Sequence, residues 1–136
     1  MDDSIREVIS GVAKDILNKN RPIILLTGNL GAGKTTLTKF ILAELNINEE
    51  VTSPTFSLIN VYPYGAKQVY HLDLYRLDSL EEALDIGIEE ILHSGNYTII
   101  EWPQIIEDIL PLKSCTLINI LSDNNGDRVY DIKTFD

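Results

Sequence analysis

The sequence predicts an α/β fold in which helices flank a mixed central sheet in three layers. Two observations lead to this prediction. A short apolar strand, residues 23–27, is joined by a glycine-rich turn to a helical stretch, residues 36–45. Further apolar and β-branched runs alternate with helix and turn signals along the rest of the chain. The length of 136 residues suits a single domain, residues 1–136, which is large enough for a three-layer core.

A helix is expected before the first strand, and its candidate N-cap residues are Asp2, Asp3 and Ser4. Apolar residues then recur with the helical period, which is typical of a helix that packs its apolar stripe on a sheet. These residues are Ile5, Val8, Ile9, Val12, Ile16 and Leu17. The stretch after the glycine turn has a similar apolar face, made by Leu37, Phe40, Ile41 and Leu45.

The glycine-rich turn, residues 28–35, matches G-x-x-x-x-G-K-[ST] at every required position, which is the pattern of a phosphate-binding P-loop. Gly28 and Gly33 permit backbone angles that a Cβ would forbid. Backbone N–H groups of the loop and of the following helix N-terminus then face a bound phosphate. The fold is therefore expected to be P-loop NTPase-like. The expected nucleotide-binding residues are Gly28, Asn29, Leu30, Gly31, Ala32, Gly33, Lys34, Thr35 and Thr36.

Three side chains at the end of this loop have distinct expected roles. Lys34 is expected to reach the β and γ phosphates as a mobile cation, and so to act in catalysis. The Thr35 hydroxyl is expected to ligate Mg²⁺, which prefers oxygen ligands. Thr36 is placed to contact the α phosphate.

Strands at residues 56–62 and 68–74 are expected to pair as an antiparallel hairpin around a turn at 63–67. Asn125-Gly126 predicts a type I′ turn between the last two strands. The remaining elements, in chain order, are a short helix capped by Ser79 and broken at Gly87, a helical turn at 88–92, a buried strand at 96–101, a short helix at 105–110, and strands at 115–121 and 128–135.

Two carboxylates follow apolar strands and are candidates to complete a hydrolytic site. Asp73 ends the strand that contains His71, and Glu101 ends the most apolar strand after the P-loop. Hydrolysis needs a further Mg²⁺ anchor and a group that orients water. We expect Glu101 to hold the metal and Asp73 to orient the water or to act from a second layer. We expect His71 to be a structural residue. The alternative is that it reaches the site from its position beside Asp73.

Composition limits the classes of partner. The formal net charge is −10, from 21 acidic and 11 basic residues, which argues against tight direct binding of nucleic acid. The single cysteine, Cys115, has apolar neighbours and is expected in the core. Neither a signal peptide nor a membrane-spanning run is apparent, so a cytoplasmic protein is expected.

The motifs together resemble the bacterial TsaE (formerly YjeE) family. The resemblance covers about residues 1–121 and is carried by four stretches in order. They are the P-loop through Thr36, Ser53-Pro54-Thr55-Phe56, His71-Leu72-Asp73-Leu74-Tyr75-Arg76-Leu77 and Glu101-Trp102-Pro103. The P-loop is generic, whereas its combination with the last two stretches is specific. One departure is Asn29, where the family commonly has Asp.

The resemblance implies an ATPase needed for threonylcarbamoyladenosine formation at position 37 of tRNAs that read codons starting with A. ATP and Mg²⁺ are the implied cofactors, with Thr35 and Glu101 holding the metal and Asp73 matching the family's aspartate. The implied partners are the threonylcarbamoyl transferase subunit and its non-catalytic paralogue, of the TsaD and TsaB type. No direct tRNA binding by this chain alone is expected. Residues Thr52 to Phe56 resemble a switch segment that senses the γ phosphate.

Two alternatives belong to other classes. A small P-loop metabolite kinase would need arginines that clamp the acceptor and a lid that excludes water. The chain has four arginines, and no arginine-bearing lid is visible between the P-loop and the terminal hairpin. A small GTPase would need an Asn-Lys-x-Asp stretch to read guanine, and none occurs.

Overall fold

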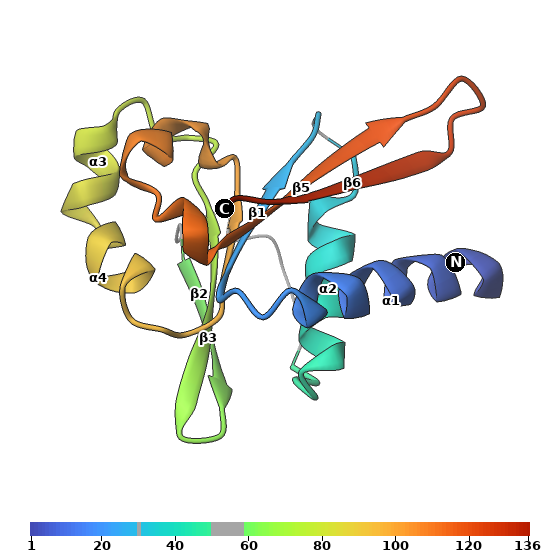
Figure 1. Cartoon of the computed structure of the whole chain (residues 1–136), viewed down its shortest axis with the longest axis horizontal. Coiled ribbons are helices and arrows are strands. Elements are labelled where there is room, and N and C mark those ends of the chain that lie inside the picture. Colours follow the sequence, from blue (N-terminus) through green and yellow to red (C-terminus); the bar gives the residue numbers. More distant parts are fainter. Residues whose placement is uncertain (30, 50–58) are drawn as a thin grey trace.

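A computed structural model describes residues 1–29, 31–49 and 59–136, and within these residues six strands form one sheet. The strand order is β2-β3-β4-β1-β5-β6 (Figure 1). The strands are β1 (Ile23–Thr27), β2 (Ile59–Tyr64), β3 (Lys67–Asp73), β4 (Thr98–Glu101), β5 (Cys115–Ser122) and β6 (Arg128–Thr134). The α-helices are α1 (Asp3–Asn18), α2 (Lys34–Glu44), α3 (Leu80–Asp85) and α4 (Ile88–Leu92), with 3₁₀ helices η1 (Pro103–Ile109) and η2 (Leu112–Ser114).

The sheet is parallel at its centre and antiparallel at both edges. β1 runs parallel to β4 and to β5, and β3 runs parallel to β4. β2 and β6 are added as antiparallel hairpin strands on β3 and β5. The carboxyl ends of β1, β3 and β4 therefore meet at one edge of the sheet, which is where ligands bind in open α/β folds.

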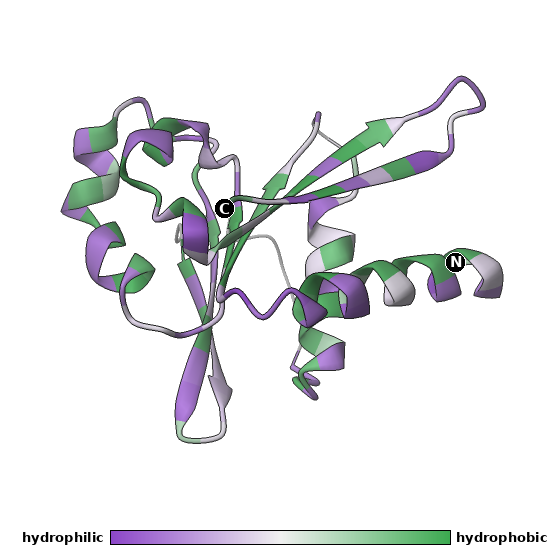
Figure 2. Ribbon diagram, in the orientation of Figure 1, coloured by the Kyte–Doolittle hydropathy of each residue, from purple (hydrophilic) through white to green (hydrophobic). Residues whose placement is uncertain are grey.

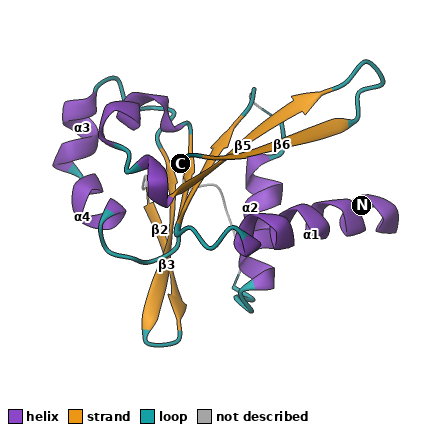
Figure 3. Cartoon of the chain, in the orientation of Figure 1, coloured by secondary structure: helices purple, strands orange, loops and turns teal. Residues whose placement is uncertain are grey.

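Helices cover both faces of the sheet, as the three-layer prediction requires. α1 and α2 lie on one face, and α3, α4 and the 3₁₀ helices lie on the other (Figure 3). Each face has its own cluster of buried apolar residues. Figure 2 shows the central strands coloured as hydrophobic and the tip of the β5–β6 hairpin as hydrophilic. β1 is apolar throughout because both of its faces are covered.

The first helix is capped as predicted, but its apolar stripe is only partly buried. The Asp2 carboxylate accepts a hydrogen bond from the Ser4 backbone N–H at 2.7 Å. Ile9 and Ile16 pack in the core, whereas Ile5 is 50% exposed and Val8 is 58% exposed. The prediction that the whole stripe packs on the sheet is therefore wrong at these two residues. The N-terminal part of α1 extends beyond the central strands and lies beside the β5–β6 hairpin (Figure 1).

Both hairpin turns differ from the sequence-based prediction. Pro63 and Tyr64 pair with Gln68 and Lys67, so the first turn is confined to Gly65-Ala66. Edge strand β2 tolerates Pro63 because a sheet edge does not require every N–H.

The second turn is centred one residue earlier than the predicted Asn125-Gly126. The Gly126 N–H donates to the Asp123 carbonyl at 3.1 Å, and Gly126 adopts φ +80° while Asn125 does not have a positive φ. The Asp123 carboxylate also accepts from the Asn125 and Asp127 N–H groups, which favours this loop over a type I′ turn.

The short helices after the first hairpin agree closely with the sequence-based predictions. The Ser79 hydroxyl accepts from the Glu82 N–H, and Gly87 at φ +85° separates α3 from α4. Cys115 is fully buried. Among the described residues, no helix has both the length and the apolar character needed to cross a bilayer.

Candidate functional site

The glycine loop connects the carboxyl end of β1 to the first turn of α2. A Cβ on Gly28 would lie 2.8 Å from the Ile120 carbonyl oxygen, so the chain requires glycine there for close packing against β5. Gly33 is the N-cap residue of α2 and has φ +106°, a conformation that favours glycine. Leu30, one of the predicted binding residues, lies outside the described residues.

Lys34 is a nearly buried cation held by the loop itself. Its Nζ donates hydrogen bonds to the carbonyls of Gly28 at 2.8 Å and Asn29 at 3.0 Å. The same nitrogen lies 4.3 Å from the centroid of the Trp102 ring, within cation–π range. Burial lowers the pKa of Lys34, and the carboxylates of Glu101 and Asp73 partly offset this effect. The backbone of the loop thus positions the ammonium group at the cavity.

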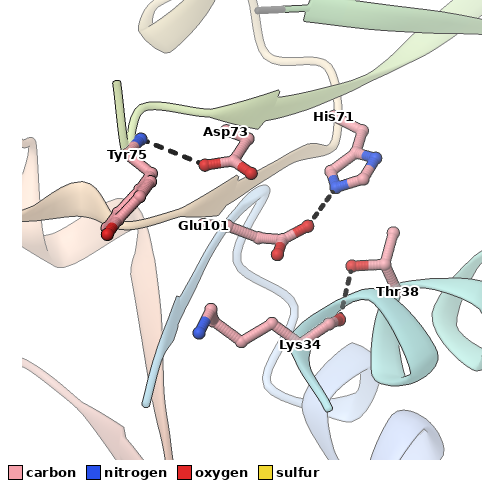
Figure 4. A network of polar contacts seen from close by, with 6 residues as sticks. All are labelled: Lys34, Thr38, His71, Asp73, Tyr75 and Glu101. Carbon is pink, nitrogen blue, oxygen red and sulfur yellow. Dashed lines mark hydrogen bonds and ion pairs between the residues drawn. The ribbon is translucent and has the colours of Figure 1, made fainter. Parts of the chain in front are cut away.

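Thr35 and Thr36 lie in the first turn of α2 and line the same cavity as Lys34. This turn also carries backbone N–H groups that have no partner within the helix. Thr38 packs below it and donates its hydroxyl to the Lys34 carbonyl at 2.9 Å, which ties the first two turns together (Figure 4).

The two predicted carboxylates are neighbours across parallel strands. Asp73 of β3 is in register with Glu101 of β4, and Glu101 is in register with Leu26 of β1. Figure 4 shows Glu101 between Asp73 and the Lys34 side chain. Glu101 is 3% exposed, whereas Asp73 is partly exposed and accepts from the Tyr75 N–H at 3.0 Å. The structure therefore brings together the residues that the sequence selected.

The environment of Asp73 disfavours its charged form. Burial raises the pKa of Asp73 above its usual range, and the neighbouring charge of Glu101 adds to the effect. The Tyr75 N–H bond and the charges of His71 and Lys34 act in the opposite direction. An acid with a raised pKa is a better proton acceptor than an ordinary surface aspartate.

His71 belongs to the site, although sequence reasoning treated it mainly as structural. Its Nε2 lies 2.5 Å from Oε2 of Glu101, and both side chains are buried. Nδ1 of His71 has no hydrogen-bond partner among the described residues. Side chains two positions apart on a strand share a face, so the spacing of His71 and Asp73 was the available signal.

One cavity of about 310 Å³ collects these groups at the edge of the sheet. It also contains an arginine that sequence reasoning missed. Arg128 lies at the start of β6, and no local motif marks it. The residues that line the cavity are Gly31, Gly33, Lys34, Thr35, Thr36, Asp73, Glu101, Trp102 and Arg128.

The side-chain oxygen atoms that line the cavity suit a hard cation that also binds phosphate oxygens. Within the described part of the chain, no cluster of three or more His, Cys, Asp and Glu residues could hold a metal ion alone. Glu101 and the Thr35 hydroxyl nevertheless border the cavity together. Mg²⁺ is typically bound by one or two carboxylates together with substrate phosphates, so these residues fit such an ion.

Two parts of the family-like stretches are not among the described residues that line this cavity. Arg76, from the stretch that contains Asp73, is exposed and does not line the cavity. The candidate switch, Thr52 to Phe56, lies outside the described residues.

The fold and the site define an α/β protein in which a glycine loop, a lysine and two carboxylates share one cavity at the carboxyl ends of the central strands. A family model described as "Threonylcarbamoyl adenosine biosynthesis protein TsaE" matches residues 4–130. The chain belongs to this TsaE family, as its motifs predicted.

Individual relatives agree with this membership. The chain is 41% identical to the tRNA threonylcarbamoyladenosine biosynthesis protein TsaE of Treponema pallidum over 104 residues, which is 76% of each chain. It is 38% identical to the Bacillus subtilis protein of the same name over 96 residues, 71% of this chain and 60% of that one. The crystal structure of Bacillus subtilis YdiB superposes with a TM-score of 0.64 at 31% identity, covering 87% of this chain and 74% of that one.

Proposed function

We propose that this chain is a Mg²⁺-dependent ATPase that supports formation of threonylcarbamoyladenosine at position 37 of tRNA. The observation that carries the proposal is the cavity in which Lys34, Thr35, Asp73 and Glu101 meet around the glycine loop. Membership of the TsaE family supports the tRNA-modification pathway, because relatives carry that description.

The loop would bind the phosphates of ATP through its backbone N–H groups and the N-terminus of α2. Lys34 is already held over the cavity by the Gly28 and Asn29 carbonyls. Its charge would therefore lie next to the β and γ phosphates. Thr36, in the first turn of α2, would contact the α phosphate.

The two carboxylates would have different roles, one in metal binding and one in orienting water. The Thr35 hydroxyl and Glu101 would hold Mg²⁺, which when bound neutralises developing charge on the phosphate oxygens. His71 fixes the orientation of Glu101 through the 2.5 Å contact. Asp73 would orient the attacking water and accept its proton, a role favoured by its raised pKa.

Partners would be needed for full activity. The chain carries a net charge of −10, which is unsuited to gripping tRNA, so we assign tRNA contact to other subunits. We propose the threonylcarbamoyl transferase subunit and its paralogue, of the TsaD and TsaB type, as those partners. Residues Thr52 to Phe56 are the proposed segment that reports the γ phosphate to them.

Calorimetric titration with Mg²⁺–ATP tests the nucleotide site. The wild-type protein should bind, and Lys34→Ala should lose detectable binding because the phosphates lose the loop's only cation. GTP should bind more weakly than ATP. Lys39→Ala is the matched control, since Lys39 is an exposed lysine on the same helix. Thermal melts of all three proteins establish that each is folded.

Wild-type affinity in Lys34→Ala would remove the glycine loop from the proposal. Equal losses in Lys34→Ala and Lys39→Ala would mean that general charge, and not this cavity, holds the nucleotide.

A further inference from the structure

The last residue of β1, Thr27, is joined to the neighbouring strand β5 through its side chain. Thr27 is in register with Asn119 across the parallel pair of strands. The Thr27 hydroxyl donates a hydrogen bond to the side-chain oxygen of Asn119, and it also lies 3.3 Å from the carbonyl oxygen of Ile118. This contact fixes the end of β1 to β5 beyond what the backbone pairing supplies.

The residue after Thr27 begins the glycine loop and packs on the same strand. A Cβ on Gly28 would lie 2.8 Å from the Ile120 carbonyl oxygen, so the backbone of Gly28 is in close contact with β5. Successive residues of β5, from Ile118 to Ile120, thus contact successive residues at the junction of β1 and the loop. The position of the start of the loop is therefore set by β5.

The carbonyl of Gly28 in turn holds the lysine of the site. Lys34 Nζ donates to this carbonyl at 2.8 Å and to the Asn29 carbonyl at 3.0 Å. A displacement of Gly28 would move one of these acceptors, and the ammonium group with it. A continuous path of contacts therefore runs from Asn119 through Thr27 and Gly28 to Lys34.

The two side chains at the start of this path lie outside the nucleotide cavity. Thr27 and Asn119 are both partly buried, and neither is among the described residues that line the cavity. An effect of either side chain on nucleotide binding would therefore be transmitted through the loop. Small displacements of a loop weaken the contacts that it makes with a ligand, because binding groups need precise placement.

We propose that the Thr27–Asn119 pair positions the start of the glycine loop, and through the Gly28 carbonyl the Lys34 ammonium group, for nucleotide binding. The proposal rests on nucleotide binding at the glycine loop. Thr27 and Asn119 are positioning residues, since they act through Gly28 and touch no nucleotide themselves. Lys34 is assigned to the β phosphate, which ADP and ATP share, so loss of the pair weakens the binding of both nucleotides.

Calorimetric titration with ADP and with Mg²⁺–ATP tests this role on the wild-type protein, Thr27→Val, Asn119→Ala and the double variant. Valine removes the hydroxyl of Thr27 and keeps the shape of the side chain. Each single variant should weaken both nucleotides by about 3- to 10-fold, the range expected for one hydrogen bond. The double variant should bind no more weakly than the single variants, because all three lack the same bond. Thr27→Ser keeps the hydroxyl and should retain most of the affinity.

Thr98→Val is the matched control. Thr98 is a buried threonine at the amino end of β4, on the edge of the sheet opposite the glycine loop. Its hydroxyl donates to the Asn96 carbonyl at 3.0 Å, so this variant also loses one hydrogen bond. It should lower the melting temperature and leave nucleotide affinity unchanged. Thermal melts of all variants separate a general loss of stability from a displaced loop.

Four results would overturn the proposal. Wild-type affinity in Thr27→Val and Asn119→Ala would remove the pair from nucleotide binding and leave the proposed function standing. Additive losses in the double variant would mean that the two side chains act independently. An equal loss in Thr98→Val would assign the effect to general stability. Absence of binding by the wild-type protein would refute the proposed function and this role together.

Discussion

At the scale of single residues, the site combines a cation and two carboxylates with unequal environments. Lys34 and Glu101 are almost fully buried, whereas Asp73 is partly open to the cavity. Glu101 already has a partner in His71, whereas Asp73 accepts a hydrogen bond from the Tyr75 N–H and has a raised pKa. These environments favour a fixed metal ligand at Glu101 and a proton acceptor at Asp73.

Substitution of each carboxylate by its amide separates the two proposed roles. Glu101→Gln should weaken Mg²⁺-dependent ATP binding, because a neutral amide is a poor ligand for a hard cation. Asp73→Asn should bind ATP nearly normally and lose roughly 10²-fold or more in turnover. Titrations with and without Mg²⁺, together with single-turnover rates, measure both effects. The reverse pattern would exchange the two assignments.

At the scale of secondary-structure elements, two glycines have opposite consequences for stability. Gly126 adopts φ +80° in the β5–β6 loop, where an alanine would be strained although nothing lies within 4 Å of its Cβ. Gly11 lies inside α1, and a Cβ there would also meet nothing within 4 Å. Backbone conformation is therefore the feature that distinguishes these two sites.

Gly126→Ala should lower the free energy of unfolding by about 1–2 kcal/mol, the cost of a left-handed non-glycine residue. Gly11→Ala should raise it by roughly 0.5–1 kcal/mol through helix propensity. Denaturant unfolding of both variants measures the difference. Destabilisation by Gly11→Ala would mean that the surface of α1 is covered in solution, and a neutral Gly126→Ala would contradict the turn geometry.

The elements most readily predicted were those with local signals. The P-loop pattern predicted β1, the loop and α2. Because Asp73 and Glu101 each end a predicted strand, both were expected at the edge of the sheet, where the structure has them. The prediction of a type I′ turn at Asn125-Gly126 was wrong, because the Asp123 carboxylate accepts hydrogen bonds that stabilise a different loop.

Features that depend on long-range packing could not be predicted in the same way. The Arg128 contact with Gly33 joins segments 95 positions apart, and it follows from the β5–β6 hairpin's position beside β1. The exposure of Ile5 and Val8 depends on where α1 extends past the sheet, which helical periodicity does not specify. The pairing of His71 with Glu101 likewise required the register of β3 and β4.

At the scale of the whole molecule, net charge and site geometry are the two features that motivate the proposed dependence on partners. The chain is strongly acidic, so tRNA should be bound by other subunits. Arg128 lines the cavity, but it begins β6, which lies across β1 from the strands that carry Glu101 and Asp73. A transition-state arginine is worth about 10³–10⁵ in rate where one is present. We therefore expect slow hydrolysis by the protein alone.

The most direct test of the account measures ATP hydrolysis by the protein alone, with the transferase pair, and with tRNA alone, using Lys34→Ala as the inactive control in each case. We predict slow hydrolysis alone, clear stimulation by the transferase pair, no stimulation by tRNA alone, and no activity in the control. Stimulation by tRNA but not by the transferase pair would contradict the partner assignment and indicate a direct role on RNA. Phosphorylation of a small metabolite, with no response to either addition, would instead establish the kinase alternative.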